Sequence, residues 1–255
     1  MVNQSDISQA DLAVAASPAR KDAVKLPLLR TSFAYSAKKI AAHMSAYKDI
    51  PKVLDIGCGS KSDIGRYLKE RNTPALIHGV DLDEYALKNQ DVDQLFICDA
   101  AEMPFDDDTY DVVFSQFLLE HVESSEKTIN AIARVMAKDG LATLIIPNPT
   151  SIEATVTRLT PYNFHIFFKQ KVQLSDTASE DTFPTLFDFK SIKHLKKQME
   201  AAGFKDVEAV FVPEVYFRFR FRPILVRLAL LYSRILETLN IGALMDSVVM
   251  VGYKA

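Results

Sequence analysis

The sequence predicts an α/β fold in which a mostly parallel β-sheet carries helices on both faces. Short continuous apolar runs alternate with amphipathic stretches along most of the chain, and this pattern is typical of strands buried on both faces and linked by helices. Glycines or acids follow several of these runs, where ligands of such sheets bind. The length of 255 residues suits one large domain, and right-handed crossovers leave few topologies.

The first half of the chain begins with a tail and continues as alternating strands and helices. Residues 1–30 are polar and rich in Ala and Ser, and we expect them to form a flexible tail. Residues 31–48 have helical spacing of apolar side chains, and Pro51 ends that element. The elements expected next are a strand at 52–57, a helix at 62–71, a strand at 76–80, a short helix at 84–90, and strands at 95–98 and 111–115.

The second half completes the expected sheet. Residues 125–138 predict an amphipathic helix, with Gly140 at a position where a helix end favours a left-handed residue. A strand at 141–146 stops at Pro147, and an irregular insertion rich in Phe and Thr follows at 148–186. The remaining elements are a helix at 188–202 ending at Gly203 and strands at 204–212 and 247–253, all within a single domain of residues 31–255.

An Arg- and Phe-rich segment precedes the last strand, and we treat residues 214–245 as a helical insertion. Strict alternation over 216–222 predicts a strand with three phenylalanines on one face and three arginines on the other. Residues 223–239 predict a helix with a wide apolar arc, and its narrow polar side is marked by Arg227, Arg234, Glu237 and Thr238. The helix could lie at a lipid interface or pack on the sheet or a second subunit. The arginine row could also bind a phosphorylated or carboxylated acceptor.

Composition narrows the class of protein. A net charge of −3 argues against a general nucleic-acid binder. The two cysteines, Cys58 and Cys98, have no metal-site spacing, so we expect no metal and a reduced, cytoplasmic setting. The N-terminus lacks the pattern of a signal peptide, and no uncharged apolar run is long enough to span a membrane.

Three features that suit a nucleoside follow successive predicted strands. Gly57 and Gly59 permit a sharp turn at which a ligand can touch the backbone. Asp81 lies about twenty residues further on, at the spacing at which a carboxylate binds ribose hydroxyls. Asp99 and Ala100 follow the third strand and can face an adenine edge. Each feature alone fits a tight turn, a helix cap or a loop, but their order along the sheet is specific.

Residues 52–146 resemble the cofactor-binding half of class I S-adenosylmethionine-dependent methyltransferases. The resemblance rests on the D-x-G-x-G turn at 55–59, the acid after the second strand, and the D-A-x-x-x-P-F segment at 99–105. It also includes the Tyr-Asp-Val-Val-Phe-Ser strand followed by Leu-Glu-His-Val at 119–122. It implies a doubly wound, Rossmann-like sheet of seven strands with an antiparallel last strand, and S-adenosylmethionine as cofactor.

The resemblance also implies roles for individual residues. One departure is Lys61, where many members have a third glycine, and it leaves the pose of the methionine carboxylate open. Ser62 stands where a nicotinamide-binding turn would need glycine. By position, the methionine and ribose would be lined by Asp55, Gly57, Cys58 and Gly59, and Asp81 would bind the ribose. Leu82 would pack on adenine, and Asp99 and Ala100 would meet the adenine amine and ring. Gln116 and His121 would border the methionine and the substrate.

Methyl transfer from a sulfonium is an in-line displacement that needs mainly alignment and exclusion of water. A base is required only where the acceptor must lose a proton. His121 is the candidate base, and the alternative is that it caps the next helix or forms a hydrogen bond to the loop. Tyr162 and His165 in the insertion are candidates for contacts with the acceptor.

We therefore expect a methyltransferase that acts on a small-molecule, glycan or lipid-like acceptor. The alternative is a catalytically silent module that binds S-adenosylmethionine as a partner or sensor. Aminopropyl transfer ranks behind both, because the acids of the insertion have no recognisable spacing. We expect no nucleic-acid partner. Residues 216–240 are the candidate region for peripheral membrane contact or for a homodimer.

Overall fold

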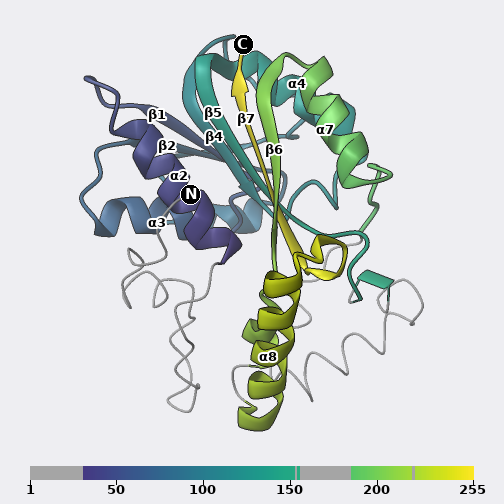
Figure 1. Cartoon of the computed structure of the whole chain (residues 1–255). Coiled ribbons are helices and arrows are strands. Elements are labelled where there is room, and N and C mark those ends of the chain that lie inside the picture. The colour runs from purple at the N-terminus through teal and green to yellow at the C-terminus, as the bar shows by residue number, and fades with distance from the viewer. Residues whose placement is uncertain (1–30, 153, 156–184, 220–221) are drawn as a thin grey trace.

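A computed structural model of the chain describes residues 31–152, 154–155, 185–219 and 222–255 (Figure 1). Its centre is a seven-stranded sheet in the order β3-β2-β1-β4-β5-β7-β6. Neighbouring strands from β3 to β5 run parallel, and β7 is antiparallel to both β5 and β6. The predicted doubly wound sheet with an antiparallel last strand is confirmed. The strands are β1 Lys52–Ile56, β2 Leu76–Asp81, β3 Gln94–Ile97, β4 Tyr110–Gln116, β5 Met136–Pro147, β6 Phe204–Val212 and β7 Ser247–Lys254.

The helices begin where hydroxyl side chains cap them. Thr31, Ser62, Ser124 and Ser191 each accept a backbone N–H from the first turn of the helix that follows. The α-helices are α2 Ser32–Met44, α3 Asp63–Glu70, α4 Ser125–Val135, α7 Ile192–Ala201 and α8 Pro223–Leu239, and the 3₁₀ helices are η2 Glu84–Lys88, η3 Val215–Phe219 and η4 Gly242–Leu244.

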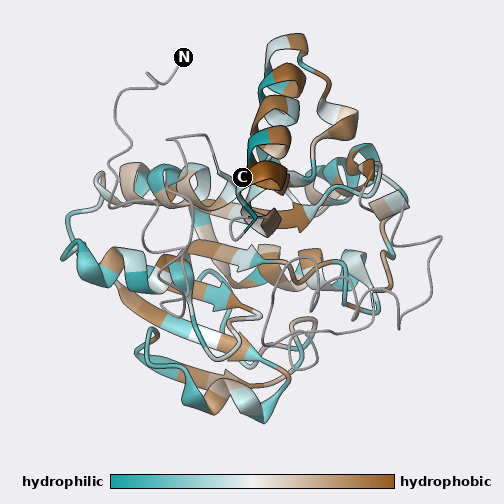
Figure 2. Ribbon diagram, turned by 90° about the horizontal axis from the view of Figure 1, so that it is seen from below, coloured by the Kyte–Doolittle hydropathy of each residue, from teal (hydrophilic) through white to brown (hydrophobic). Residues whose placement is uncertain are grey.

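Two apolar cores fill the faces of the sheet. Helices α2 and α3 pack on one face, and α4 and α7 pack on the other (Figure 1). Successive strand residues serve opposite cores, because side chains alternate along a strand. Val53 belongs to the α2–α3 side and Leu54 to the α4–α7 side. Figure 2 shows hydrophobic stretches along the central strands, with hydrophilic residues on the surrounding helices and turns.

One end of the molecule collects the carboxyl ends of the parallel strands. Strands β1, β2, β3, β4 and β5 all end there, and so does β6, since it runs in the same direction as β5. The chain leaves β6 at this end, forms η3 and α8, and returns through η4 into β7. In Figure 1, α8 extends below these strand ends, clear of the sheet.

The expected helix at 125–138 is too long at its C-terminal end. The helix α4 stops at Val135, because Met136 already pairs with Tyr110 as the first residue of β5. The left-handed residue is Asp139 at φ +61°, and Gly140 is not left-handed. Gly140 is needed for space instead, since a Cβ there would lie 2.8 Å from the carbonyl oxygen of Ala137.

The expected strand at 216–222 is wrong for its described residues. Residues 215–219 form η3, and 220–221 lie outside the described residues. Tyr216 is fully buried and packs with Val226 and Ala229 of α8. This local core favours a tight helical turn over an extended strand. The expected helix at 223–239 is confirmed as α8.

Candidate functional site

The turn after β1 depends on two left-handed glycines. Gly57 has φ +72° and Gly59 has φ +49°, a region that side chains disfavour. The N–H groups of Gly57 and Cys58 donate to the Val80 carbonyl at 2.7 and 3.1 Å, so the turn is fixed to the end of β2. A Cβ at Gly57 would lie 3.0 Å from Leu118, whereas a Cβ at Gly59 would meet nothing within 4 Å. The backbone at Gly59 is therefore open to a ligand.

Asp81 ends β2 and holds the glycine turn. One carboxylate oxygen accepts the Gly59 N–H at 2.8 Å, and the other accepts the Asp83 N–H at 2.9 Å. A carboxylate offers about four acceptor positions, so Asp81 keeps capacity for further donors such as hydroxyls. Its side chain is half-buried beside the turn.

Two residues that the sequence analysis did not single out, Asn89 and Asp91, complete the turn. The Asn89 amide donates to the carbonyls of Cys58 and Gly59 at 3.1 and 2.9 Å. Asp91 accepts the Ser62 N–H at 3.0 Å, and the Ser62 hydroxyl accepts the Gly65 N–H at the start of α3. Asn89 and Asp91 lie about thirty residues beyond the motif, and no local pattern marks them.

Carboxyl groups surround this turn. Burial raises the pKa of Asp55 to about 8, a Ser62 hydrogen bond opposes the shift, and the charges of Asp81, Asp63 and Asp91 add to it. Asp55 is 2% exposed and lies below the turn in β1. The neighbouring carboxylates give this end of the sheet a negative potential, which favours a cation and opposes a pyrophosphate.

The third strand ends beside the second. The Cys98 N–H donates to the Asp81 carbonyl at 2.9 Å. Asp99 is exposed and accepts the Ala101 N–H at 2.8 Å, while Ala100 is buried. Leu82 is 71% exposed at the same end, so its side chain is free to cover a planar ligand. The ends of β1, β2 and β3 thus form one continuous rim.

The residues after β4 form a second group. Gln116 ends β4 half-buried, and Phe117 is exposed with φ +55°. His121 is half-buried, with Nε2 3.8 Å from Oε1 of Glu120. The alternative role of His121 as a helix cap is not found, because Ser124 caps α4.

Glu120 is a further buried acid that the sequence analysis passed over. Burial raises its pKa to about 8, and it is 3% exposed. Its Oε2 atom makes no hydrogen bond within the described part of the chain. Its backbone carbonyl accepts the N–H groups of Leu186 and Phe187 at 2.7 and 3.1 Å, which places the end of the insertion against this group.

The remaining predictions concern the acceptor contacts, a metal site and a membrane-spanning helix. Tyr162 and His165, the predicted acceptor contacts, fall within 156–184 and are not described. The residues that are described contain no group of three His, Cys, Asp or Glu side chains placed to hold a metal ion. None of the described helices is long and apolar enough to cross a membrane.

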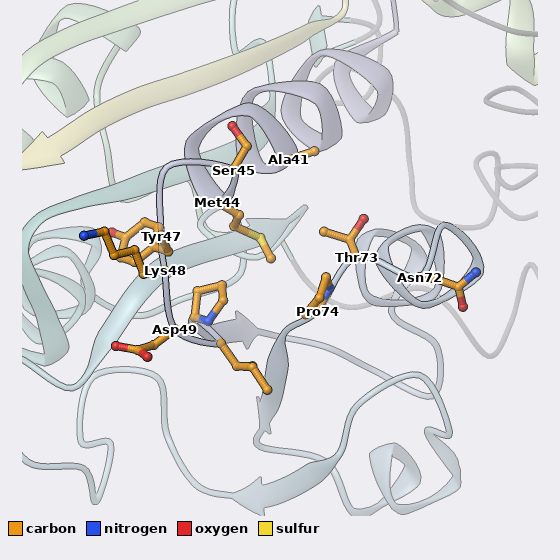
Figure 3. Close-up of a pocket in the computed structure, with 11 residues that line it drawn as sticks. Ala41, Met44, Ser45, Tyr47, Lys48, Asp49, Asn72, Thr73 and Pro74 are labelled. Carbon is orange, nitrogen blue, oxygen red and sulfur yellow. The ribbon is translucent and has the colours of Figure 1, made fainter.

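A cavity of about 540 Å³ lies at the opposite end of the sheet (Figure 3). It is lined by the end of α2 and by the segments that lead into β1 and β2, including Tyr47, Lys48 and Pro74. Because these are the amino ends of the strands, the cavity is separate from the glycine turn and its carboxylates.

The strand order and the rim of glycines and carboxylates match the arrangement of class I S-adenosylmethionine-dependent methyltransferase domains. Residues 54–144, little more than a third of the chain, match the family model of the methyltransferase domain. The match runs from Leu54, the third residue of β1, to Leu144 in the second half of β5, so it covers the whole rim.

The similar proteins include methyltransferases and a protein named as a hydroxylase. The ubiquinone/menaquinone biosynthesis C-methyltransferase UbiE of Idiomarina loihiensis is 32% identical over 43% of this chain and 45% of its own length. The arginine-hydroxylase NDUFAF5 of Mus musculus is 28% identical over 62% of this chain and 43% of its own length. The chain thus spans less than half the length of these curated relatives. A SAM-dependent methyltransferase from Archaeoglobus fulgidus shares the fold, with a TM-score of 0.54, 19% identity, and coverage of 86% and 93%.

Proposed function

We propose that this chain transfers a methyl group from S-adenosylmethionine to a small-molecule, glycan or lipid-like acceptor. The observation that carries the proposal is the acidic rim around an open glycine backbone, with Asp81 hydrogen-bonded to Gly59 and Asp55 buried beneath. S-adenosylmethionine carries a sulfonium and an ammonium group and has no phosphate. A rim of carboxylates suits such a ligand, whereas it would repel a dinucleotide.

The rim would hold the donor across three strand ends. Gly57, Cys58 and Gly59 would offer backbone to the methionine and ribose, because no side chain intervenes at Gly59. Asp81 would accept the ribose hydroxyls with its remaining acceptor positions, and Leu82 would cover the adenine. Asp99 and Ala100 would lie at the adenine edge, while Asp55 and Gln116 would border the methionine side.

When bound, S-adenosylmethionine supplies a methyl group made electrophilic by its positive sulfur. The chain then has to place the acceptor in line with that group and keep water away. His121 is proposed to receive the proton of an acceptor that must lose one, at a ring nitrogen. The raised pKa of Glu120 keeps its carboxyl largely neutral at pH 7.

Among the acceptor classes, a lipid-like molecule has specific support. The similar UbiE protein is a C-methyltransferase of ubiquinone and menaquinone biosynthesis. In this chain, the region 216–240 is proposed as the site of peripheral membrane contact or of a homodimer, within a cytoplasmic protein. No nucleic-acid partner is proposed.

Titration calorimetry with S-adenosylmethionine and S-adenosylhomocysteine tests the donor site. We expect binding by the wild type and at least about tenfold weaker binding by Asp81→Asn, because the ribose loses a charged acceptor. Asp93→Asn is the matched control, since Asp93 accepts the Ile77 N–H at the amino end of β2 and lies away from the rim. Absence of binding by the folded wild type at millimolar donor would refute the proposal.

A second assay separates an enzyme from a silent binding module. Donor labelled in the methyl group is incubated with the chain and a cell extract. Transfer of label that depends on the chain supports the enzyme. Tight donor binding without transfer to any fraction of the extract would favour the silent module.

A further inference from the structure

The helix α8 has one buried face and one exposed apolar face. Val226, Ala229 and Leu236 are buried. On the other side, a row of aliphatic residues at helical spacing is 46% to 75% exposed. We call this row the apolar stripe, and it consists of Ile224, Leu228, Leu231, Ile235 and Leu239.

Two arginines flank the apolar stripe. Arg227 and Arg234 are exposed, and their spacing of seven residues puts them on the same side of α8, next to the stripe. Within the described residues neither has an ion pair. Glu237 is the only acid of α8 and lies on the opposite side of the helix from the stripe.

The position of α8 relates it to the candidate site. It follows β6 and precedes β7 at the end of the molecule where the rim lies. In Figure 1, α8 extends beyond the strand ends, and in Figure 2 it stands at the top with brown residues along its length. The helix α8 therefore lies at the same end of the molecule as the rim.

We propose that α8 lies in the interface of an anionic membrane, with the apolar stripe among the acyl chains and the two arginines at lipid phosphates. An amphipathic helix with arginines beside an apolar face binds such surfaces through burial and charge together. The identity of the acceptor rests on the proposed methyl transfer. With that function, the acceptor is an amphiphilic molecule that reaches the rim from the membrane.

Charge favours lipid over a second copy as the occupant. In an antiparallel pair of α8 helices related by a two-fold axis, each flank of the stripe meets the same flank of its partner. The arginine flank would then face another arginine flank, with no acid between them. Anionic phosphates instead complement Arg227 and Arg234.

Sedimentation of the full chain with vesicles tests the proposal. We expect binding to phosphatidylcholine vesicles that contain phosphatidylglycerol, and much weaker binding to phosphatidylcholine alone. Leu231→Glu should weaken partitioning by at least about tenfold, because it puts a charge into the stripe. The double variant Arg227→Gln/Arg234→Gln should weaken it by roughly tenfold and reduce its salt dependence.

Matched control variants make the same kinds of substitution at the opposite end of the sheet. Ile50→Glu replaces an apolar residue that is 65% exposed, and Lys48→Gln/Lys138→Gln removes two exposed charges. Both controls should bind vesicles within about twofold of the wild type. The proposal is overturned if the wild type does not bind anionic vesicles, or if the stripe variants bind as the controls do. It is also overturned if Leu231→Glu instead disrupts a dimer seen by sedimentation velocity.

The two proposals fail independently. Calorimetry with S-adenosylhomocysteine on Leu231→Glu should match the wild type, because α8 does not form the rim. Vesicle binding without donor binding would leave membrane docking in place and remove the methyltransferase. Donor binding without vesicle binding would do the reverse.

Discussion

At the scale of single residues, the two buried acids of the site govern the pH dependence of stability. The pKa of Glu120 is about 8 because of its burial, against about 4.3 in an unfolded chain. Asp55 has a raised pKa of about 8 for the same main reason. Both acids are protonated in the folded state at neutral pH, whereas the unfolded chain would release these protons.

The sign of this pH dependence follows from the linkage between proton binding and folding. Because the folded state holds more protons between about pH 4.3 and pH 8, the free energy of unfolding decreases as pH rises through this window. Each acid contributes up to about 1.4 kcal/mol per pH unit. His43 and His78 have lowered pKa values through burial and act in the opposite direction below their usual value, so a comparison between variants is needed to isolate one acid.

We predict that Glu120→Gln makes the free energy of unfolding less dependent on pH. Gln cannot ionise, so the variant loses one contribution to the decrease between pH 5 and pH 8 and keeps that of Asp55. Urea denaturation at both pH values measures the effect. Glu126→Gln is the control, because Glu126 is an exposed Glu in the first turn of α4. A variant with the same pH slope as the wild type would contradict the burial of Glu120.

At the scale of elements, a buried amide joins the end of β5 to the start of β7. Asn148 is fully buried, and its Nδ2 atom donates to the carbonyls of Met245 and Gly242 at 2.7 and 3.1 Å. Its Oδ1 atom accepts the Thr150 N–H at 3.1 Å. The chain re-enters the sheet after α8 at this contact.

We predict that Asn148→Ala lowers the free energy of unfolding by roughly 2–4 kcal/mol, because buried carbonyls lose their donors. Chemical denaturation measures the loss. Thr150→Val is the control and should cost less, since Thr150 is exposed and its hydroxyl makes only peripheral contacts to Asn148 and Ala243. Equal losses in the two variants would argue against Asn148 as the main connection.

Sequence patterns predicted the elements better than their ends. Most of the strands contain a short apolar run, so the sheet and the order of its helices followed from the sequence pattern. The end of α4 did not, because it depends on Met136 pairing with Tyr110. The 3₁₀ turn at 215–219 depends on Tyr216 packing against α8, and this contact overrides the alternating pattern.

The candidate site likewise has a part that the sequence predicted and a part that it did not. The glycine turn and Asp81 have a fixed local spacing, so the sequence located them. Asn89 and Glu120 act through burial and through contacts distant in sequence, and no spacing marks either of them. Their places in the site became visible only once the strand ends were assembled.

At the scale of the whole molecule, the apolar cores differ in size and in the elements that they hold together. Two large cores cover the faces of the sheet, and a third small one joins η3 to α8 through Tyr216, Val226 and Ala229. The helix α8 therefore depends on a few local contacts, whereas α4 packs directly on the sheet. Local stability follows the amount of buried apolar contact.

We predict that α8 opens without unfolding of the sheet. In hydrogen exchange without lipid, the amides of α8 should exchange at least about tenfold faster than those of α4, which corresponds to about 1.4 kcal/mol in opening free energy. The two helices make a matched comparison within one molecule, because each is longer than ten residues. Tyr216→Ala should widen the difference by removing the centre of the small core, while exchange in β4 stays unchanged. If α8 and α4 exchange together in the wild type, α8 belongs to the same cooperative unit as the sheet.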